Sequence, residues 1–349
     1  MISSILVGIL GNMRTKTAKS ALMHQSAVDI QGAALMMRRI DMAGNVNLHN
    51  AKVTQNDEFY TQIADIEREL KYYREHFKGA VVFCNCDDPE WSGFWRYFHL
   101  NFEFLGLKKL ISTHYDANVP TYKMVYEGGN DANTTEGVIT PLKQNGDFRS
   151  VECVELLDEA TIVCTNPPFS IAREFYVPQL IEHQKKFIIV GDLNWATYKT
   201  IFPLLKANKM WFGNTSVKEF LQPDGTKKKF GNKLWYTNLD IVKRHETIDL
   251  IEKYTPEKFP KYDNYDAIEV SRTLNIPYDY DGAMGVPISF LNNYNPDQFE
   301  ILGLFTENRG EDFINGTPVY VDEKHKHSFC PVLNQKRLFP RVLIRRRKG

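Results

Sequence analysis

The chain has 349 residues, and its 43 Lys and Arg balance its 43 Asp and Glu, so the formal net charge is zero. With this balance, overall charge does not favour binding to nucleic acid. Any basic surface must come from basic residues that are grouped on one part of the protein. The five cysteines are odd in number and show no C-x-x-C spacing, which argues against a disulfide framework and a zinc ribbon.

No apolar run approaches the ~20 residues that a membrane span requires. Residues 2–10 are apolar, but basic residues follow them rather than precede them, which is the wrong polarity for a signal peptide. These features predict a cytoplasmic protein without a membrane segment. The length allows one large α/β domain and a smaller second one.

Residues 1–50 combine small residues, methionines and scattered basic residues without a clean period, and we expect an N-terminal arm there. Its basic residues could contact DNA phosphates, although a solvated arm explains them as well. The chain then reads Asn-Asp-Glu-Phe-Tyr-Thr at 56–61, ahead of a strongly helical stretch at Asp65–Phe77. N–H groups and a hydroxyl before a helix suit a carboxylate ligand, and an ordinary helix N-cap is the alternative.

A buried strand is expected from Val81, and it runs into Cys-Asn-Cys-Asp-Asp-Pro with no glycine-rich loop before Gly93. A carboxylate at this strand end, Asp87 or Asp88, can accept hydrogen bonds from ligand hydroxyl or ammonium groups, or can cap the next helix. A second strand, Leu107–Thr113, precedes the candidate contact Tyr115. We expect a surface excursion at residues 126–140, which have loop composition.

Gly-Asp-Phe-Arg at 146–149 places an acid beside an aromatic residue at what we expect to be the end of a third strand. Asp147 and Phe148 could hydrogen-bond and cover a planar amino-bearing ring there. A simple Gly-Asp turn is the alternative. A helix, residues 151–157, is expected to follow.

The stretch Ala160–Ser170 organises the rest of the chain. Ala160–Cys164 is a short apolar and β-branched run typical of a buried parallel strand. Asn166-Pro167-Pro168-Phe169 ends it abruptly, because two prolines donate nothing to a sheet and stiffen the turn. The Asn oxygen and the following Pro carbonyl can accept both hydrogens of an exocyclic amine, and the Phe offers a stacking face for a planar base. A proline-punctuated turn with Phe169 in the core is the alternative.

Strands and helices alternate from residue 81 to 212, which predicts an α/β, doubly wound parallel sheet. Helices are expected at 171–183 and 197–208, with a strand at 186–191 between them. From 213 on, basic residues interleave with aromatic ones around an Asp-Gly turn, and the chain ends in a basic cluster. We expect DNA-binding residues in these two clusters, although each alone could be a solvated face. They are Lys227, Lys228, Lys229, Arg345, Arg346 and Arg347.

Asn-Pro-Pro-Phe resembles the catalytic motif of S-adenosylmethionine-dependent amino-methyltransferases, and residues 50–349 resemble the EcoRI-type adenine-N6 DNA methyltransferases. The resemblance implies a Rossmann-like class I sheet in a catalytic domain at 51–212 and a C-terminal target-recognition region at 213–349. It implies that the catalytic residues are Asn166, Pro167, Pro168 and Phe169. It implies that the cofactor-binding residues are Phe59, Tyr60, Thr61, Asn85, Asp87, Asp88, Tyr115, Asp147 and Phe148.

The implied function is methyl transfer from S-adenosyl-L-methionine to a flipped adenine in double-stranded DNA, as in restriction–modification, with no metal. We expect a monomer, which would suit methylation of one strand at a time, and a cognate restriction endonuclease that shares the site without a stable complex stays open. Two alternatives stay open. One is an RNA or protein glutamine N-methyltransferase with the same core, and the other is a DNA-binding protein without catalysis.

Overall fold

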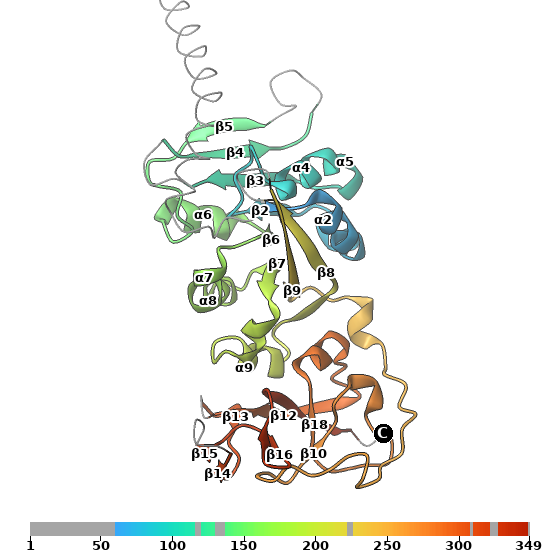
Figure 1. Cartoon of the computed structure of the whole chain (residues 1–349). Coiled ribbons are helices and arrows are strands. Elements are labelled where there is room, and N and C mark those ends of the chain that lie inside the picture. The colour runs from blue at the N-terminus through green and yellow to red at the C-terminus, as the bar shows by residue number, and fades with distance from the viewer. Residues whose placement is uncertain are drawn as a thin grey trace, which may run out of the picture. The chain divides into compact units, whose positions relative to one another are not determined.

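Nine strands of the described residues form one large sheet in this computed structural model, which describes residues 60–115, 120–129, 137–221, 226–307, 310–321 and 327–347. The strand order is β1-β8-β9-β7-β6-β2-β3-β4-β5 (Figure 1). The strands are β1 Tyr60–Thr61, β2 Val81–Cys84, β3 Lys109–His114, β4 Tyr122–Tyr126, β5 Val138–Pro141, β6 Ile162–Thr165, β7 Lys186–Asp192, β8 Trp211–Leu221 and β9 Lys227–Thr237. The expected arm at 1–50 and Phe59 lie outside the described residues.

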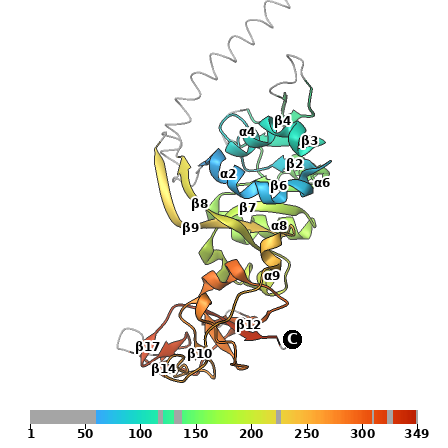
Figure 2. The ribbon, with the colours of Figure 1, turned by 90° about the vertical axis from the view of Figure 1, so that its right-hand side faces the viewer.

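This sheet is mixed, whereas we expected a parallel one. Its centre, β3-β2-β6-β7, is parallel as the strand–helix alternation predicts. Both flanks are antiparallel: β4 and β5 continue the sheet beyond β3, and β9, β8 and β1 continue it beyond β7. The pairs β3–β4, β4–β5 and β8–β9 each join strands that are consecutive in the chain, whereas β1 and β8, and β7 and β9, are not consecutive. Figure 2 shows β8 and β9, in yellow, running side by side.

Helices cover both faces of the parallel centre, with α2, α4 and α5 on one side and α6 and α8 on the other (Figure 1). Alternate strand residues supply the two cores: Phe83 and Val163 face the α6 and α8 side, whereas Val82 and Ile162 face the α2 and α4 side. The α-helices are α2 Ile63–Leu70, α3 Arg74–Phe77, α4 Gly93–Leu100, α5 Phe102–Leu105, α6 Val151–Glu159, α7 Phe169–Ile171, α8 Val177–Glu182 and α9 Phe202–Lys206. Short 3₁₀ segments are η1 Lys71–Tyr73, η3 Leu193–Thr197, η4 Val242–His245, η5 Thr273–Asn275 and η6 Ile288–Asn293.

Local capping chemistry sets several helix ends. The Ser92 hydroxyl accepts from the backbone N–H of Phe94 at 3.0 Å and begins α4, and the Ser150 hydroxyl does the same for α6. Gly106 ends α5 with a φ of 64°, the left-handed conformation in which a Cβ is costly. These caps place the ends of the helices beside the strands that carry the site.

The helix expected at 171–183 is interrupted. A π-helical turn, η2 Ala172–Tyr176, separates α7 from α8. Such turns add a residue to the helix and occur frequently at functional sites. Here the Tyr176 side chain is fully buried against the ring of Phe148, at 5.2 Å between centroids. The helix expected at 197–208 is likewise split into η3 and the shorter α9.

A second, five-stranded sheet follows, in the order β10-β11-β18-β12-β13. Its strands are β10 Ile268–Glu269, β11 Met284–Val286, β12 Phe299–Phe305, β13 Phe313–Ile314 and β18 Arg341–Arg346. Two small ladders pair β14 Val319–Tyr320 with β15 His327–Ser328 and β16 Val332–Leu333 with β17 Lys336–Arg337. Contacts from α9 join the two sheets: Lys206 pairs with Asp312 at 2.8 Å, and the ring of Phe202 lies 5.6 Å from that of Phe313.

The large sheet extends beyond the domain boundary that we expected at residue 212. That boundary falls inside β8, and β9 carries the sheet to Thr237. The basic hairpin assigned to the recognition region is therefore part of the sheet that carries Asn-Pro-Pro-Phe. Composition changes at 213, but the register of β8 and β9 with β7 is set by pairing between residues far apart in the chain.

Candidate active site

The carboxyl ends of β2, β6 and β7 meet at one edge of the sheet because these strands are parallel and adjacent. Asp87 follows β2, Asn166 follows β6, and Asp192 is the last residue of β7. Two of these three positions were predicted as site residues from the sequence. Asp192 was not predicted as a site residue, because its role depends on contacts with residues of β9.

The Asp87 carboxylate holds the start of the Asn-Pro-Pro-Phe loop. It accepts a hydrogen bond from the Thr165 hydroxyl and another from the backbone N–H of Asn166 at 3.1 Å. Asp87 is only 4% exposed, and this burial raises the pKa of its carboxyl to about 6, while the bonds from Thr165 and Asn166 oppose the rise. Asp87 thus ties the end of β6 to the loop after β2.

The two prolines shape the loop differently. Pro168 begins α7, and its carbonyl accepts from the N–H groups of Ile171 at 3.3 Å and Ala172 at 3.0 Å. Pro167 is buried, and within the described part of the chain no donor bonds to its carbonyl. That carbonyl and the half-buried Asn166 side chain follow each other directly at the strand end. They are two adjacent oxygen acceptors on a stiff backbone.

The Phe169 ring is half-buried and held on several sides. Trp195 and Phe220 each contact it edge-on, at 6.1 Å between centroids. The Lys233 ammonium lies 3.9 Å from the ring centroid and pairs with Asp192 at 2.8 Å. Lys233 is only 7% exposed. In the sequence Lys233 is one lysine in a basic cluster. Only its place within β9, where its side chain is buried, distinguishes it from the exposed lysines near it.

Unsatisfied polar groups lie buried near this edge. The Thr61 hydroxyl and both amide atoms of Asn85 are buried without a hydrogen bond in the described part of the chain. The Tyr176 hydroxyl lies near Asn85 without hydrogen-bond alignment, and burial raises its pKa well above the usual value. Buried polar groups are rarely left unpaired in native proteins, so such a cluster indicates a place for a polar ligand. The residue types, hydroxyl and amide, fit the ammonium, carboxylate and ribose groups of S-adenosylmethionine.

Tyr60 and Thr61 form β1, which pairs with Leu221 and Phe220 at the end of β8. The Thr61 carbonyl passes so close to Gly93 that a Cβ there would lie 2.4 Å from it. Gly93 therefore permits β1 to pack on the start of α4. This contact brings the predicted residues Tyr60 and Thr61 beside the helix that follows Asp87.

The other predicted cofactor residues make contacts within the chain. Asp88 accepts from His114 Nδ1 at 2.7 Å and from the Tyr122 hydroxyl at 3.4 Å, which joins the loop after β2 to β3 and β4. Tyr115 follows β3 and is 51% exposed. Asp147 does not follow a third parallel strand, because β5 before it is an antiparallel edge strand.

Asp147 pairs with Arg149 at 2.7 Å, and this bond lowers the pKa of the Asp147 carboxyl. Phe148 is buried in the core against Tyr176 rather than exposed. The two residues thus face opposite environments, although they are adjacent in the sequence.

Three of the predicted DNA-binding residues lie on β9, and the other three lie at and just after the end of β18. Lys227 and Lys229 lie on β9, 3.6 and 3.4 Å from Glu219 of β8, and both are exposed. Lys228, on the same strand, lies 5.2 Å from the ring of Phe230.

Arg345 and Arg346 are the last two residues of β18, and Arg347 follows it directly. Arg345 pairs with Glu300 at 2.9 Å, and Arg346 is opposite Phe299 in the ladder. Arg347 donates to the Pro296 carbonyl at 2.7 Å. Two of these three guanidinium groups thus have partners within the second sheet.

The described residues contain no cluster of three or more His, Cys, Asp or Glu side chains able to hold a metal ion. None of their helices has the length and apolar character of a membrane span.

The family described as adenine-specific methyltransferase EcoRI matches residues 47–347. The type II methyltransferase M.EcoRI of Escherichia coli is 45% identical over 292 residues, which cover 74% of this chain and 89% of that protein. M.MpnI of Mycoplasma pneumoniae is 35% identical, covering 86% of this chain and 98% of its own length. M.MgeORF184P of Mycoplasma genitalium is 34% identical, with 86% and 99% covered. No solved structure matches the chain significantly.

Proposed function

The chain belongs to the EcoRI family of adenine-specific DNA methyltransferases, and from this premise we propose how its residues carry out the reaction. The proposal is methylation of the N6 amino group of an adenine flipped out of double-stranded DNA, as in restriction–modification. The observation that carries the proposal is the position of Asn-Pro-Pro-Phe at the carboxyl end of β6. Asp87 holds one side of this loop, and aromatic rings that contact Phe169 hold the other.

In this proposal the loop binds the adenine amino group. Asn166 Oδ1 and the Pro167 carbonyl each accept one of its hydrogens, which draws the nitrogen lone pair out of conjugation with the ring. Phe169 stacks on the base, and its contacts with Trp195 and Lys233 fix the plane of the ring. Because these groups are held in place before the substrate binds, positioning supplies most of the rate enhancement.

We propose S-adenosyl-L-methionine as the cofactor, with Tyr60, Thr61 and Asn85 at the centre of its site. Bound there, it supplies a methyl group activated by a sulfonium. The buried hydroxyl of Thr61 and amide of Asn85 would gain the hydrogen-bond partners that they lack within the chain. Asp88, Tyr115, Asp147 and Phe148 complete the proposed site through the family resemblance. Asp87 acts in this proposal by positioning the catalytic loop.

The finer architecture belongs to the same proposal. We infer that the parallel centre with helices on both faces is a Rossmann-like class I sheet and that the region after Thr237 recognises the target sequence. DNA contact is assigned to Lys227, Lys228 and Lys229 in preference to Arg345, Arg346 and Arg347, since β9 carries these exposed lysines on the same strand as Lys233, which lies over Phe169. A monomer suits methylation of one strand at a time, and a cognate endonuclease would act on the same site separately.

The test is methylation with tritiated S-adenosylmethionine of PCR-amplified genomic DNA, which carries no methyl groups, beside total RNA and cell protein. Label in N6-methyladenine of DNA is the expected result. Asn166→Ala should remove this label, because one of two amine acceptors is lost, while cofactor affinity measured by calorimetry stays within about twofold. Full turnover by this variant would contradict the mechanism. Label in RNA or protein alone would overturn the substrate.

A further inference from the structure

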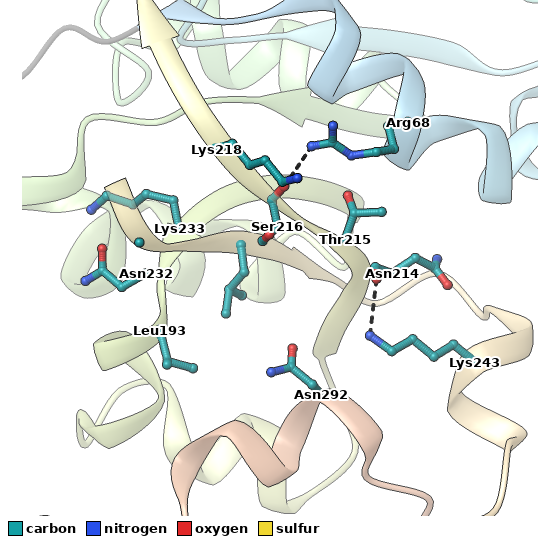
Figure 3. A pocket seen from close by; sticks show the side chains of 12 residues that line it. Arg68, Leu193, Asn214, Thr215, Ser216, Lys218, Asn232, Lys233, Lys243 and Asn292 are labelled. Carbon is teal, nitrogen blue, oxygen red and sulfur yellow. Dashed lines mark hydrogen bonds between the residues drawn. The ribbon is translucent and has the colours of Figure 1, made fainter. Parts of the chain in front are cut away.

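An open cavity of about 440 Å³ is lined by residues of α2, η3, β8, β9, η4 and η6 (Figure 3). Four of these elements each contribute a basic side chain to its wall. The four are Arg68, Lys218, Lys233 and Lys243. Amide and hydroxyl groups such as those of Asn214 and Thr215 supply the rest of the polar lining. No Asp or Glu of the described residues lines the cavity, so its chemistry selects an anion.

Three of the four basic side chains are held in place by contacts within the chain. Arg68 donates to the Ser216 carbonyl at 3.0 Å, and Lys243 donates to the Gly213 carbonyl at 3.0 Å. Lys233 is fixed by Asp192 at 2.8 Å. Their positions therefore do not depend on a ligand. An anion that enters meets ordered donors and loses little binding energy to ordering side chains.

The carboxylates that balance these charges lie outside the cavity wall. Asp65 pairs with Arg68 from within α2, and Asp192 pairs with Lys233 from the end of β7. Lys218 is exposed on β8 and has no carboxylate within ion-pair distance among the described residues. Lys218 is thus the cation that can engage a ligand without giving up a partner.

Lys233 joins the cavity to the proposed base-binding site. Lys233 is one of the residues that line the cavity, and its ammonium lies 3.9 Å from the centroid of Phe169. In a nucleotide strand each base is joined through one sugar to its own phosphates. A base stacked on Phe169 would therefore bring a flanking phosphate towards the cations of this cavity.

We propose that this cavity binds a backbone phosphate of the DNA strand that carries the target adenine; the inference rests on the function proposed above. The competing anion is the carboxylate of the cofactor. That group is accompanied by an ammonium, which requires an acceptor, and the cavity presents no carboxylate. A phosphodiester carries negative charge alone and matches a site lined by cations and neutral donors.

The decisive variant is Lys218→Gln, compared with Lys186→Gln. Lys186 is exposed at the amino end of β7, the sheet edge opposite the site, and its removal changes net charge equally. The measurements are Kd for the same PCR-amplified DNA across a salt series, KM and kcat for its methylation, and Kd for S-adenosylhomocysteine. Lys218→Gln should weaken DNA binding about fivefold and lower the salt-dependence slope by about 1. Lys218→Arg should restore both.

The outcomes separate this inference from the proposed function. Equal DNA Kd and salt slope in Lys218→Gln and Lys186→Gln would overturn the phosphate site even if the wild type methylates DNA. Loss of S-adenosylhomocysteine affinity at unchanged DNA affinity would assign the cavity to the cofactor and also overturn it. A wild type that methylates no DNA would contradict the proposed function, while the direct DNA Kd values would still decide on the cavity.

Discussion

Asp87 shows how one side chain can connect two strand ends at the site. The sequence placed a carboxylate after the first central strand and suggested a ligand contact or a helix cap. In the structure the carboxylate turns inward and accepts the N–H of Asn166 at 3.1 Å. Because it is buried, its charge is stabilised mainly by that bond and by the Thr165 hydroxyl. The position of Asn166 therefore depends on the ionisation of Asp87.

We expect the methylation rate to fall as the pH drops through about 6, where Asp87 takes up a proton. In the folded protein the pKa of Asp87 is raised above its unfolded value of about 3.9. Asp87 therefore stabilises the fold when the pH is below about 3.9, and this stabilisation is lost as the pH rises towards 6. Activity and this stability contribution should thus change in opposite directions. Profiles of kcat and of the unfolding free energy between about pH 4 and 8 would show both changes.

The matching variant is Asp87→Asn, which keeps an acceptor but cannot ionise. Its kcat should be roughly tenfold lower at pH 8, because charge-assisted bonds become neutral ones, and the acidic limb near pH 6 should disappear. Asp263→Asn serves as the control, since Asp263 is exposed, accepts the N–H groups of Asn334 and Gln335 and has no part in the proposed site. An unchanged acidic limb in Asp87→Asn would contradict the role assigned to Asp87.

At the scale of elements, helix α2 takes the place of a partner strand for part of β8. The register of β8 with β9 shifts between Phe212 and Ser216, so the ladder is broken there. Glu69 accepts the N–H groups of Asn214 and Thr215, each at 2.7 Å. One helical turn earlier, Asp65 accepts the N–H of Lys218 at 2.9 Å. Residues four apart share a helix face, which lets both carboxylates reach the same strand.

Glu69→Gln should destabilise the protein by about 1 to 3 kcal/mol, because an amide cannot replace both acceptor oxygens and a buried N–H of β8 loses its partner. The urea midpoint should fall with an unchanged slope. Glu67→Gln is the matched control, since Glu67 is exposed on the same helix. If both variants unfold at the wild-type midpoint, α2 does not stabilise β8 in this way.

For the molecule as a whole, the end of the chain is structural. β18 lies between β11 and β12, and it pairs antiparallel with both. Val342, Leu343 and Ile344 in its middle are fully buried. A strand in the centre of a sheet supplies hydrogen bonds to two neighbours and side chains to the core. Its basic residues cannot be treated as an arm that detaches from the fold.

Truncation after Pro340 should therefore unfold the second sheet, since three buried apolar side chains are worth roughly 1.5–3 kcal/mol each. Limited proteolysis with mass spectrometry should show new cleavage sites between residues 268 and 340. Removal of residues 348–349 alone should leave the wild-type pattern. A truncated protein with wild-type protease resistance and weakened DNA binding would instead support a detachable basic arm.

The sequence by itself determined the local features of the site. An apolar, β-branched strand followed by Asn-Pro-Pro-Phe predicts a rigid loop at a sheet edge. The two prolines, which have no N–H groups, make the loop rigid, and they lie within the stretch itself. The parallel centre followed from strand–helix alternation in the same way. The assignment of individual cofactor and DNA contacts stays a prediction.

Only the tertiary structure decided which residues surround that loop. Lys233 looks like its neighbours in a lysine-rich stretch, and its burial over Phe169 follows from the pairing of β9 with β7. The antiparallel flanks, the inward turn of Asp87 and the central place of β18 likewise depend on partners far along the chain. Strand pairing is set by burial and register between distant segments, and no short stretch contains that information.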